Sequence, residues 1–87
     1  MHKLVYTKEA KKQIQRFDGA VKRQIETALF KLAQDPAAGK RLTGDLSSFL
    51  SYRSGDYRIL YRILHHEIMV MIFSVGHRKG VYRKVKY

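Results

Sequence analysis

Residues 49–82 read FLSYRSGDYRILYRILHHEIMVMIFSVGHRKGVY, and they decide the fold because three β-rich runs follow one another here. The runs span residues 49–53, 57–64 and 68–75 and are rich in the aromatic and β-branched side chains that favour strands. Ser54-Gly55-Asp56 is typical of a tight hairpin turn, and His65-His66 indicates a second turn. Because the connections are so short, an antiparallel meander is predicted.

Alternation along residues 57–64 assigns their side chains to the two faces of the sheet. One face receives Tyr57, Ile59, Tyr61 and Ile63, and the other receives Arg58, Leu60, Arg62 and Leu64. Residues 68–75 are almost continuously apolar, which predicts a central strand that is buried on both faces. Gly76 is expected to end that strand.

The first half of the chain predicts one strand and two helices. Residues 3–6 favour a strand, and Thr7 is a typical N-cap for a helix over 8–17. Asp18-Gly19 interrupts this helix, and Asp18 is expected to cap a second helix over 20–34. Each helix has an apolar stripe for packing on the sheet, formed by Ala10, Ile14 and Phe17 and by Val21, Ile25, Ala28, Leu29 and Leu32.

Together these elements predict an α+β fold of order β-α-α-β-β-β. It is a small antiparallel sheet with an N-terminal helical hairpin packed on one face. The 87 residues form a single domain, 1–87. Pro36 ends the second helix, and residues 39–44 form a loop whose adjacent cations Lys40 and Arg41 are either solvated or in contact with phosphate.

The charge of the chain points to an anionic partner. Lys and Arg number 18 against 7 Asp and Glu, giving a formal net charge of +11. Nucleic acid is the leading class, because neutralising phosphates releases counterions. An acidic protein partner is compatible with it, and a membrane surface is disfavoured because no long basic amphipathic helix is present. The absence of cysteine, of a signal peptide and of a spanning segment leads us to expect a cytoplasmic protein.

Several kinds of site are excluded by the sequence. It has no Walker loop, no GxGxxG motif and no zinc-binding pattern, and no pair of its carboxylates is placed for Mg²⁺. We therefore expect neither a metal nor a cofactor. A metal-free ribonuclease would use the 2′-hydroxyl of RNA as nucleophile, with a base, an acid and cations that stabilise the charged transition state.

The residues suited to these roles are Arg53, Arg58, Arg62, His77, Arg78 and Tyr82. Arg is permanently charged and bidentate toward phosphate, whereas His and Tyr can carry protons. In a meander, Arg53, Arg58 and Arg78 converge at one end of the sheet. The alternatives are that Arg58 pairs with a carboxylate, that Arg62 is solvated, that His77 is a turn residue and that Tyr82 packs on the core.

Three segments carry a resemblance to a known family. They are the loop KRLTG at 40–44, the segment YRSGDYRILY at 52–61 and the segment SVGHRKGVY at 74–82. In this order, in a basic chain of this size, they resemble the RelE/ParE superfamily of type II toxins over essentially the whole chain. The resemblance places the protein in the RelE-like branch.

The resemblance implies a ribosome-dependent endoribonuclease that cuts mRNA in the A site by 2′-hydroxyl attack. Arginines at the positions of Arg58 and Arg78 would stabilise the transition state, and a tyrosine matching Tyr82 would aid proton transfer or stacking. A cognate acidic, RelB-like antitoxin would neutralise the toxin in a hetero-oligomer. It would be partly disordered alone and would fold on binding. Contacts with the mRNA and rRNA backbones would come from Lys40, Arg41, Arg53, Lys79, Arg83, Lys84 and Lys86.

The sequence also departs from the RelE pattern. Two lysines usually found in the strand before the signature appear as Phe49 and Ser51, and Tyr82 follows Arg78 more closely than in the family. We therefore predict that His77 replaces the missing lysine as a proton carrier. The alternatives are a ParE-type inhibitor of DNA gyrase, which shares the fold, and a degenerate toxin that serves only to bind antitoxin.

Overall fold

The computed structural model describes residues 2–64 and 69–77. Within these residues, two α-helices, five strands and two short 3₁₀ segments follow one another: β1 (Lys3–Tyr6), α1 (Lys8–Arg16), α2 (Gly19–Gln34), η1 (Pro36–Ala38), β2 (Lys40–Arg41), η2 (Gly44–Leu46), β3 (Leu50–Ser54), β4 (Tyr57–Leu64) and β5 (Met69–His77). The predicted turn residues His65 and His66 lie outside the described residues. So does the C-terminal group Arg78, Lys79, Tyr82, Arg83, Lys84 and Lys86.

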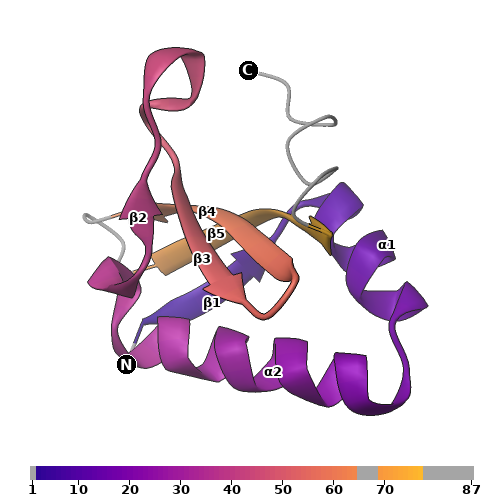
Figure 1. The fold of residues 1–87 in the computed structure, drawn as a ribbon. Coiled ribbons are helices and arrows are strands. Elements are labelled where there is room, and N and C mark those ends of the chain that lie inside the picture. The colour runs from indigo at the N-terminus through magenta and orange to yellow at the C-terminus, as the bar shows by residue number, and fades with distance from the viewer. Residues whose placement is uncertain (1, 65–68, 78–87) are drawn as a thin grey trace.

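The strands form one mixed sheet in the order β1-β5-β4-β3-β2. The β3-β4-β5 meander is antiparallel as predicted, but β1 pairs in parallel with β5, from Lys3↔Met69 to Tyr6↔Ile72. The prediction of a wholly antiparallel sheet was therefore wrong at this edge. After β1 the helices carry the chain to the far edge, and the meander brings it back to lie beside β1 (Figure 1).

Strand β5 is longer than its sequence indicated. Gly76 does not end it, because Arg58 pairs with Gly76 and Tyr57 pairs with His77 at the start of β4. The ladder also contains a β-bulge. Leu60 pairs with Ser74 and Tyr61 with Ile72, so Phe73 is the extra residue on β5.

The main core lies between one face of the sheet and the two helices. The predicted helix stripes are confirmed, since Ile25, Ala28, Leu29 and Leu32 pack with the β4 residues Ile59 and Tyr61. Both helices contribute to this cluster, but they do not form the predicted antiparallel hairpin. Figure 1 shows α1 turning away from the end of α2 in an L, with α2 along the sheet and α1 beside β5 and β1.

A second, smaller core lies under the loop that joins β2 to β3. Phe49 and Leu60 are buried there, with Leu42, Leu46 and Phe73 packed around them. Figure 1 shows this loop projecting beyond the sheet. It covers one end of the face that the helices leave free, and we call the rest of that face the open face: it bears Lys40, Ser51, Arg53 and Arg58. Within residues 2–64 and 69–77, no helix is both long and apolar enough to cross a membrane.

Candidate functional site

Arg53 and Arg58 face one another across β3 and β4. The register pairs them directly, and the neighbouring pair Tyr52↔Ile59 packs toward the helices. Side chains alternate between faces, so both guanidinium groups belong to the open face. The prediction that these two arginines converge is confirmed. Like charges opposite each other in a sheet destabilise it, so this arrangement favours a bound anion.

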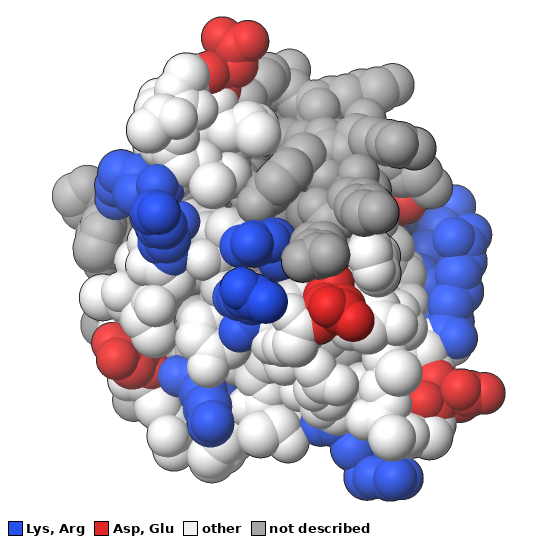
Figure 2. Space-filling view, viewed as in Figure 1, with Lys and Arg blue, Asp and Glu red and all other residues white. Residues whose placement is uncertain are grey.

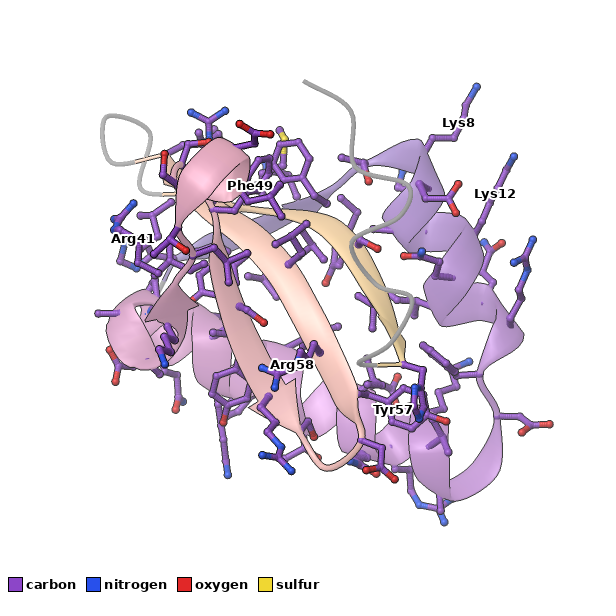
Figure 3. All side chains as sticks on the ribbon, turned by 45° about the horizontal axis from the view of Figure 1, so that its top comes forward. Lys8, Lys12, Arg41, Phe49, Tyr57 and Arg58 are labelled. Atoms are coloured by element: carbon purple, nitrogen blue, oxygen red, sulfur yellow. The ribbon has the colours of Figure 1, made fainter. Side chains whose placement is uncertain are left out.

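The two arginines differ in how they are held. The Nε of Arg53 donates a hydrogen bond to the carbonyl of Gly55 at 3.1 Å, which ties this exposed side chain to the turn. Arg58 is half-buried, and within the described part of the chain no ion pair or hydrogen bond holds its guanidinium. Figure 3 shows Arg58 over β4 on the open face, and Figure 2 shows Lys and Arg side chains grouped over the β3–β4 region. Among residues 2–64 and 69–77, the alternative pairing of Arg58 with a carboxylate is therefore not seen.

Helix α2 fixes the hairpin that carries this pair. Gly55 has a φ of 61°, which suits the first central position of a two-residue hairpin loop. The Nε2 of Gln24 donates to the Ser54 carbonyl at 2.8 Å and to the Ser54 Oγ at 3.2 Å. A Cβ at position 55 would lie 2.7 Å from that same Nε2. The positive φ favours glycine here, and a side chain at this position would also displace the amide of Gln24 from its bonds to Ser54.

His77 lies on the other face. It pairs in register with Tyr57, and the two ring centroids are 6.1 Å apart in an edge-on arrangement. Tyr57 in turn makes an edge contact with Phe17 at 5.4 Å, on the side of the helices. The structure thus brings His77 to Tyr57 and not to Arg58, and it places the ring away from the facing arginines.

Lys40 and Arg41 have different positions, although they are adjacent. Lys40 pairs with Ser51 across β2 and β3, so it belongs to the open face together with Arg53. The Nη1 of Arg41 instead donates to the Ser47 carbonyl at 3.2 Å and braces the β2–β3 loop. Both side chains are exposed. Of the two cations, Lys40 is the better placed to reach an anion held by the arginines.

The buried phenol of Tyr61 positions the short strand β2. Its hydroxyl donates to the Pro36 carbonyl at 2.6 Å and accepts from the Gly39 N–H at 2.9 Å. Burial raises the pKa of Tyr61 above its ordinary value, so the phenol is neutral at physiological pH. The segment that leads into Lys40 is thus anchored to the core. Strand alternation predicted the direction of Tyr61 but could not show its hydroxyl partners.

The positions expected to carry lysines in a RelE-like pattern are buried here. Phe49 is 2% exposed and makes an edge contact with Phe73 at 4.9 Å, whereas Ser51 is 4% exposed. Arg62 lies over the Phe49 ring, 5.8 Å from its centroid. The exposed guanidinium of Arg62 is thereby drawn toward the loop. Phe49 serves packing in this chain, and the cation nearest to Ser51 in the ladder is Lys40.

Sequence reasoning missed Gln13, which seals the free edge of β5. Strand β1 covers β5 only as far as Ile72. Beyond it, the Gln13 Oε1 accepts from the Val75 N–H at 2.6 Å, and its Nε2 donates to the Ser74 Oγ at 3.1 Å. Thr7 adds a bond from its Oγ1 to the Phe73 carbonyl at 2.9 Å while also capping α1. No sequence signal distinguishes Gln13 from other polar residues of an amphipathic helix.

The helix side of the molecule has a shallow hollow of about 280 Å³ between α1, α2 and β1. Its walls are mainly apolar and are formed by Tyr6, Lys11, Ile14, Gln15, Glu26 and Leu29. Among the residues that the structure describes, no group of three or more His, Cys, Asp or Glu side chains could hold a metal ion. The facing arginines therefore remain the strongest candidate site in the described part of the chain.

The comparisons with known proteins agree on the family. Residues 4–82 match the family model described as the ParE toxin of the type II toxin-antitoxin system parDE. Toxin RelG of Mycobacterium tuberculosis is 39% identical over 61 residues, which cover 69% of this chain and 70% of the relative. The span matched by the family model includes the hairpin that carries Arg53 and Arg58.

Solved structures share the fold. The M. tuberculosis toxin-antitoxin complex RelBE2 contains a chain with a TM-score of 0.81 and 29% identity, covering 88% of this chain and 98% of that one. The isolated E. coli RelE toxin has a TM-score of 0.75 at 22% identity, covering 88% of this chain and 84% of its own, and this likeness concerns the fold alone. The chain belongs to the RelE/ParE superfamily of type II toxin-antitoxin toxins.

Proposed function

We propose that this toxin is a metal-independent endoribonuclease that cuts mRNA on the ribosome. The observation that carries the proposal is the facing pair Arg53 and Arg58 on the open face. The half-buried Arg58 has no ion pair or hydrogen bond to hold it within the described residues. A bidentate guanidinium at such a place matches the non-bridging oxygens of a phosphodiester.

The reaction needs no cofactor, because RNA supplies its own nucleophile. The 2′-oxygen forms a bond to the adjacent phosphorus while the bond from phosphorus to the 5′-oxygen breaks, leaving a cyclic phosphate and a 5′-hydroxyl. A base takes the 2′-hydroxyl proton, and an acid protonates the departing 5′-oxygen. Arg58 and Arg78 would stabilise the added negative charge of the transition state.

Proton transfer is proposed for Tyr82 and His77. Tyr82 follows Arg78 in the chain and has the chemistry for either proton role. The ring of His77 is on the face of Tyr57, so its part in proton transfer competes with a part in packing. Lys40 lies opposite Ser51 and supplies a further cation on the open face. In the family pattern, the corresponding lysine is in the strand itself, at the position of Ser51. Arg53, Lys79, Arg83, Lys84 and Lys86 would hold RNA backbones, and Arg41 would shape the loop.

The proposed partners follow from the charge of the chain. A cognate acidic, RelB-like antitoxin would neutralise the net charge of +11 and block the open face in a hetero-oligomer. The chain in the M. tuberculosis RelBE2 complex is held with its own antitoxin, which supports this partner class. Substrate and ribosome place the active toxin in the cytoplasm.

The deciding experiment is translation of a defined mRNA in a purified ribosome system, with the 3′ ends mapped. Antitoxin-free toxin should produce cuts confined to the A-site codon, and Arg78→Ala should abolish them. Folded wild-type toxin that makes no cuts would contradict the proposal. A toxin that then also has no effect on growth would be a module that only binds antitoxin.

A second candidate is inhibition of DNA gyrase, the activity implied for ParE-type members. It is favoured by one observation: the family model that matches residues 4–82 is a ParE model. A gyrase inhibitor acts by binding and needs no cationic site for a phosphodiester on the open face. A supercoiling assay separates the two, because the ribonuclease should leave gyrase turnover unchanged while translation stops.

A further inference from the structure

Gln24 places an amide on the apolar face of α2. Val21 and Ala28, which pack in the main core, lie three residues before it and four residues after it, so Gln24 belongs to the same face of the helix. Its side chain is half-buried. Core packing does not call for a polar group at this position, because an amide that loses water must regain its hydrogen bonds elsewhere. The partners of this amide therefore indicate what it does.

The amide of Gln24 contacts the turn that joins β3 to β4. Its Nε2 donates to the Ser54 carbonyl at 2.8 Å and to the Ser54 Oγ at 3.2 Å. A Cβ at position 55 would lie 2.7 Å from the same nitrogen, so the amide also lies against Gly55. Figure 1 shows this turn directly above α2. One side chain of the helix thus contacts two consecutive residues of the hairpin.

The carbonyl of Gly55 is in turn the acceptor for Arg53. The Arg53 Nε donates to this oxygen at 3.1 Å. The oxygen belongs to the central peptide of the turn, between Gly55 and Asp56. Both common two-residue hairpin turns begin with a positive φ, like the 61° of Gly55, and they differ in the direction of that central peptide. The direction of the peptide therefore decides whether Arg53 has its acceptor.

Arg53 gains order from this bond because its side chain is exposed. A free arginine samples many rotamers, and ordering it around an anion costs free energy. With Nε bound to the turn, the two terminal Nη groups can still donate to phosphate oxygens. Arg58 lies directly opposite Arg53 across the two strands. Arg53 is thus ordered beside Arg58 before any substrate arrives.

We propose that Gln24 is a positioning residue for the facing arginines. Gln24 holds the turn so that the Gly55 carbonyl stays directed at Arg53. The guanidinium of Arg53 is thereby fixed opposite Arg58 on the open face. Gln24 itself lies on the helix side of the sheet and touches no substrate. This inference rests on the proposed function for the role of the arginines, and it adds a helix residue whose effect on cleavage passes through Arg53.

The test uses variants of the full chain that each remove one part of this connection. Gln24→Leu removes the donor and keeps a side chain of similar size, and Gln24→Met is a second version with an unbranched chain. Ser54→Ala removes the longer bond, at 3.2 Å, and keeps the carbonyl bond at 2.8 Å. Gln34→Leu, at the exposed end of α2, is the matched control. None of these changes alters the charge, so long-range attraction to RNA is constant across the series.

The first readout is the single-turnover rate of cleavage on ribosomes with a defined mRNA. Gln24→Leu should lower this rate by about tenfold to a hundredfold, because a group misplaced by about 1 Å at a reacting centre can cost that much. Ser54→Ala and Gln34→Leu should stay close to the wild-type rate. Affinity for an mRNA with a 2′-O-methyl group at the cut site, which blocks the nucleophile, should change little, because the other cations still hold the RNA.

A double-mutant cycle shows whether the effect passes through Arg53. Arg53→Ala alone should lower the rate at least as much as Gln24→Leu does. In the Arg53→Ala background, Gln24→Leu should lower the rate by less than about twofold further, because the residue that it positions is gone. Equal losses in the two backgrounds would overturn the proposal, since Gln24 would then act on the fold as a whole.

A second measurement does not depend on cleavage. The Nε–H of Arg53 gives its own signal in a proton–nitrogen correlation spectrum, and its bond to Gly55 should slow exchange with water. Gln24→Leu should accelerate this exchange and leave exchange at Arg58 as in the wild type. Unchanged exchange at Arg53 in the folded variant would contradict the positioning role. If the wild-type toxin makes no cuts, the ribonuclease proposal fails, and this signal still decides whether Gln24 positions Arg53.

Discussion

At the scale of single residues, Arg58 is the position on which the site depends most. It is half-buried, directly opposite Arg53, and without an ion pair in the described chain. Removing a group that stabilises transition-state charge typically lowers the rate by about 10²–10³. We expect this loss for mRNA cleavage by Arg58→Ala. Arg58→Lys should recover only part of it, because lysine lacks the bidentate geometry.

The control for Arg58 is Arg62 on the same strand. Arg62 lies over Phe49 and is drawn toward the β2–β3 loop. Arg62→Ala should therefore leave the cleavage rate within about threefold, an effect that is small beside the loss of a transition-state contact. Similar losses in both variants, measured in the same translation system, would mean that β4 provides general charge and not a specific phosphate contact.

Substitution of Lys40 tests whether a cation on β2 compensates for the two lysines that Phe49 and Ser51 replace. It lies opposite Ser51, whereas its neighbour Arg41 is bonded to Ser47. Lys40→Met should reduce cleavage about tenfold or more, because general electrostatic contacts at such sites contribute at this level or above. Arg41→Met should mainly loosen the loop. Activity that depends more on Arg41 than on Lys40 would refute this assignment.

His77 has two possible roles, and substitutions separate them. Its ring packs edge-on against Tyr57, so the structure favours packing. If His77 serves packing, His77→Phe should retain cleavage and His77→Ala should lower the unfolding midpoint. If His77 instead carries a proton, both variants should lose cleavage.

At the scale of elements, side chains of the described residues hold the edge of β5 beyond the end of β1. Gln13→Leu removes the acceptor of the Val75 N–H and a partner of Ser74. Leaving the buried N–H of Val75 without its acceptor costs about 1–3 kcal/mol, and we expect the free energy of unfolding to fall by that amount. Hydrogen exchange at Val75 should accelerate. Gln15→Leu, two residues away on the same helix and exposed, is the control and should have little effect.

The anchoring of β2 by Tyr61 predicts a pH dependence. Burial raises the Tyr61 pKa in the folded state, so its contribution to stability is fully present below the unfolded value of about 10. This contribution is lost as the pH rises from the unfolded value through the raised pKa of folded Tyr61. Tyr61→Phe should destabilise at neutral pH by about 1–3 kcal/mol, since Pro36 and Gly39 lose a partner. In urea titrations, the free energy of unfolding of the variant should also decrease less at alkaline pH than that of the wild type.

The elements that could be predicted from sequence are those with local signals. Both helix stripes and the hairpin at Gly55 follow from spacing and turn chemistry. The parallel pairing of β1 with β5 was missed because Lys3 and Met69 are far apart in the chain, and nothing local encodes the partner. The bulge at Phe73 and the two residues added to β5 depend on register across β4, which is set by tertiary packing.

The same division applies to the candidate site. Arg53 and Arg58 could be predicted to converge because a two-residue turn separates their strands. The face of His77 could not be predicted while Gly76 was expected to end the strand, because a strand that continues through Gly76 places the next side chain on the face opposite to that of Arg58. Gln13 and Lys40 gained their significance only from contacts across the fold. Arg78 and Tyr82 lie outside the described residues, so their roles stay predictions.

At the scale of the whole molecule, an excess of positive charge should make stability depend on an acidic partner. A formal charge of +11 on 87 residues repels itself in the folded state. An antitoxin that binds only the folded toxin stabilises it by about 4 kcal/mol at a thousandfold excess over its dissociation constant. For a domain of this size, that corresponds to about 16 °C or more in unfolding midpoint. Calorimetry of the toxin with and without antitoxin measures this shift directly.

Salt separates charge neutralisation from other sources of that stabilisation. If acidic side chains of the antitoxin act by neutralising the basic toxin, raising the salt concentration should shrink the shift, because exposed charges are screened beyond about 10 Å at 0.1 M. The isolated toxin should respond in the opposite direction, since salt relieves its own repulsion. The two midpoints should therefore converge with increasing salt. A shift that is independent of salt would instead assign antitoxin binding to apolar contacts, such as the hollow lined by Tyr6, Ile14 and Leu29.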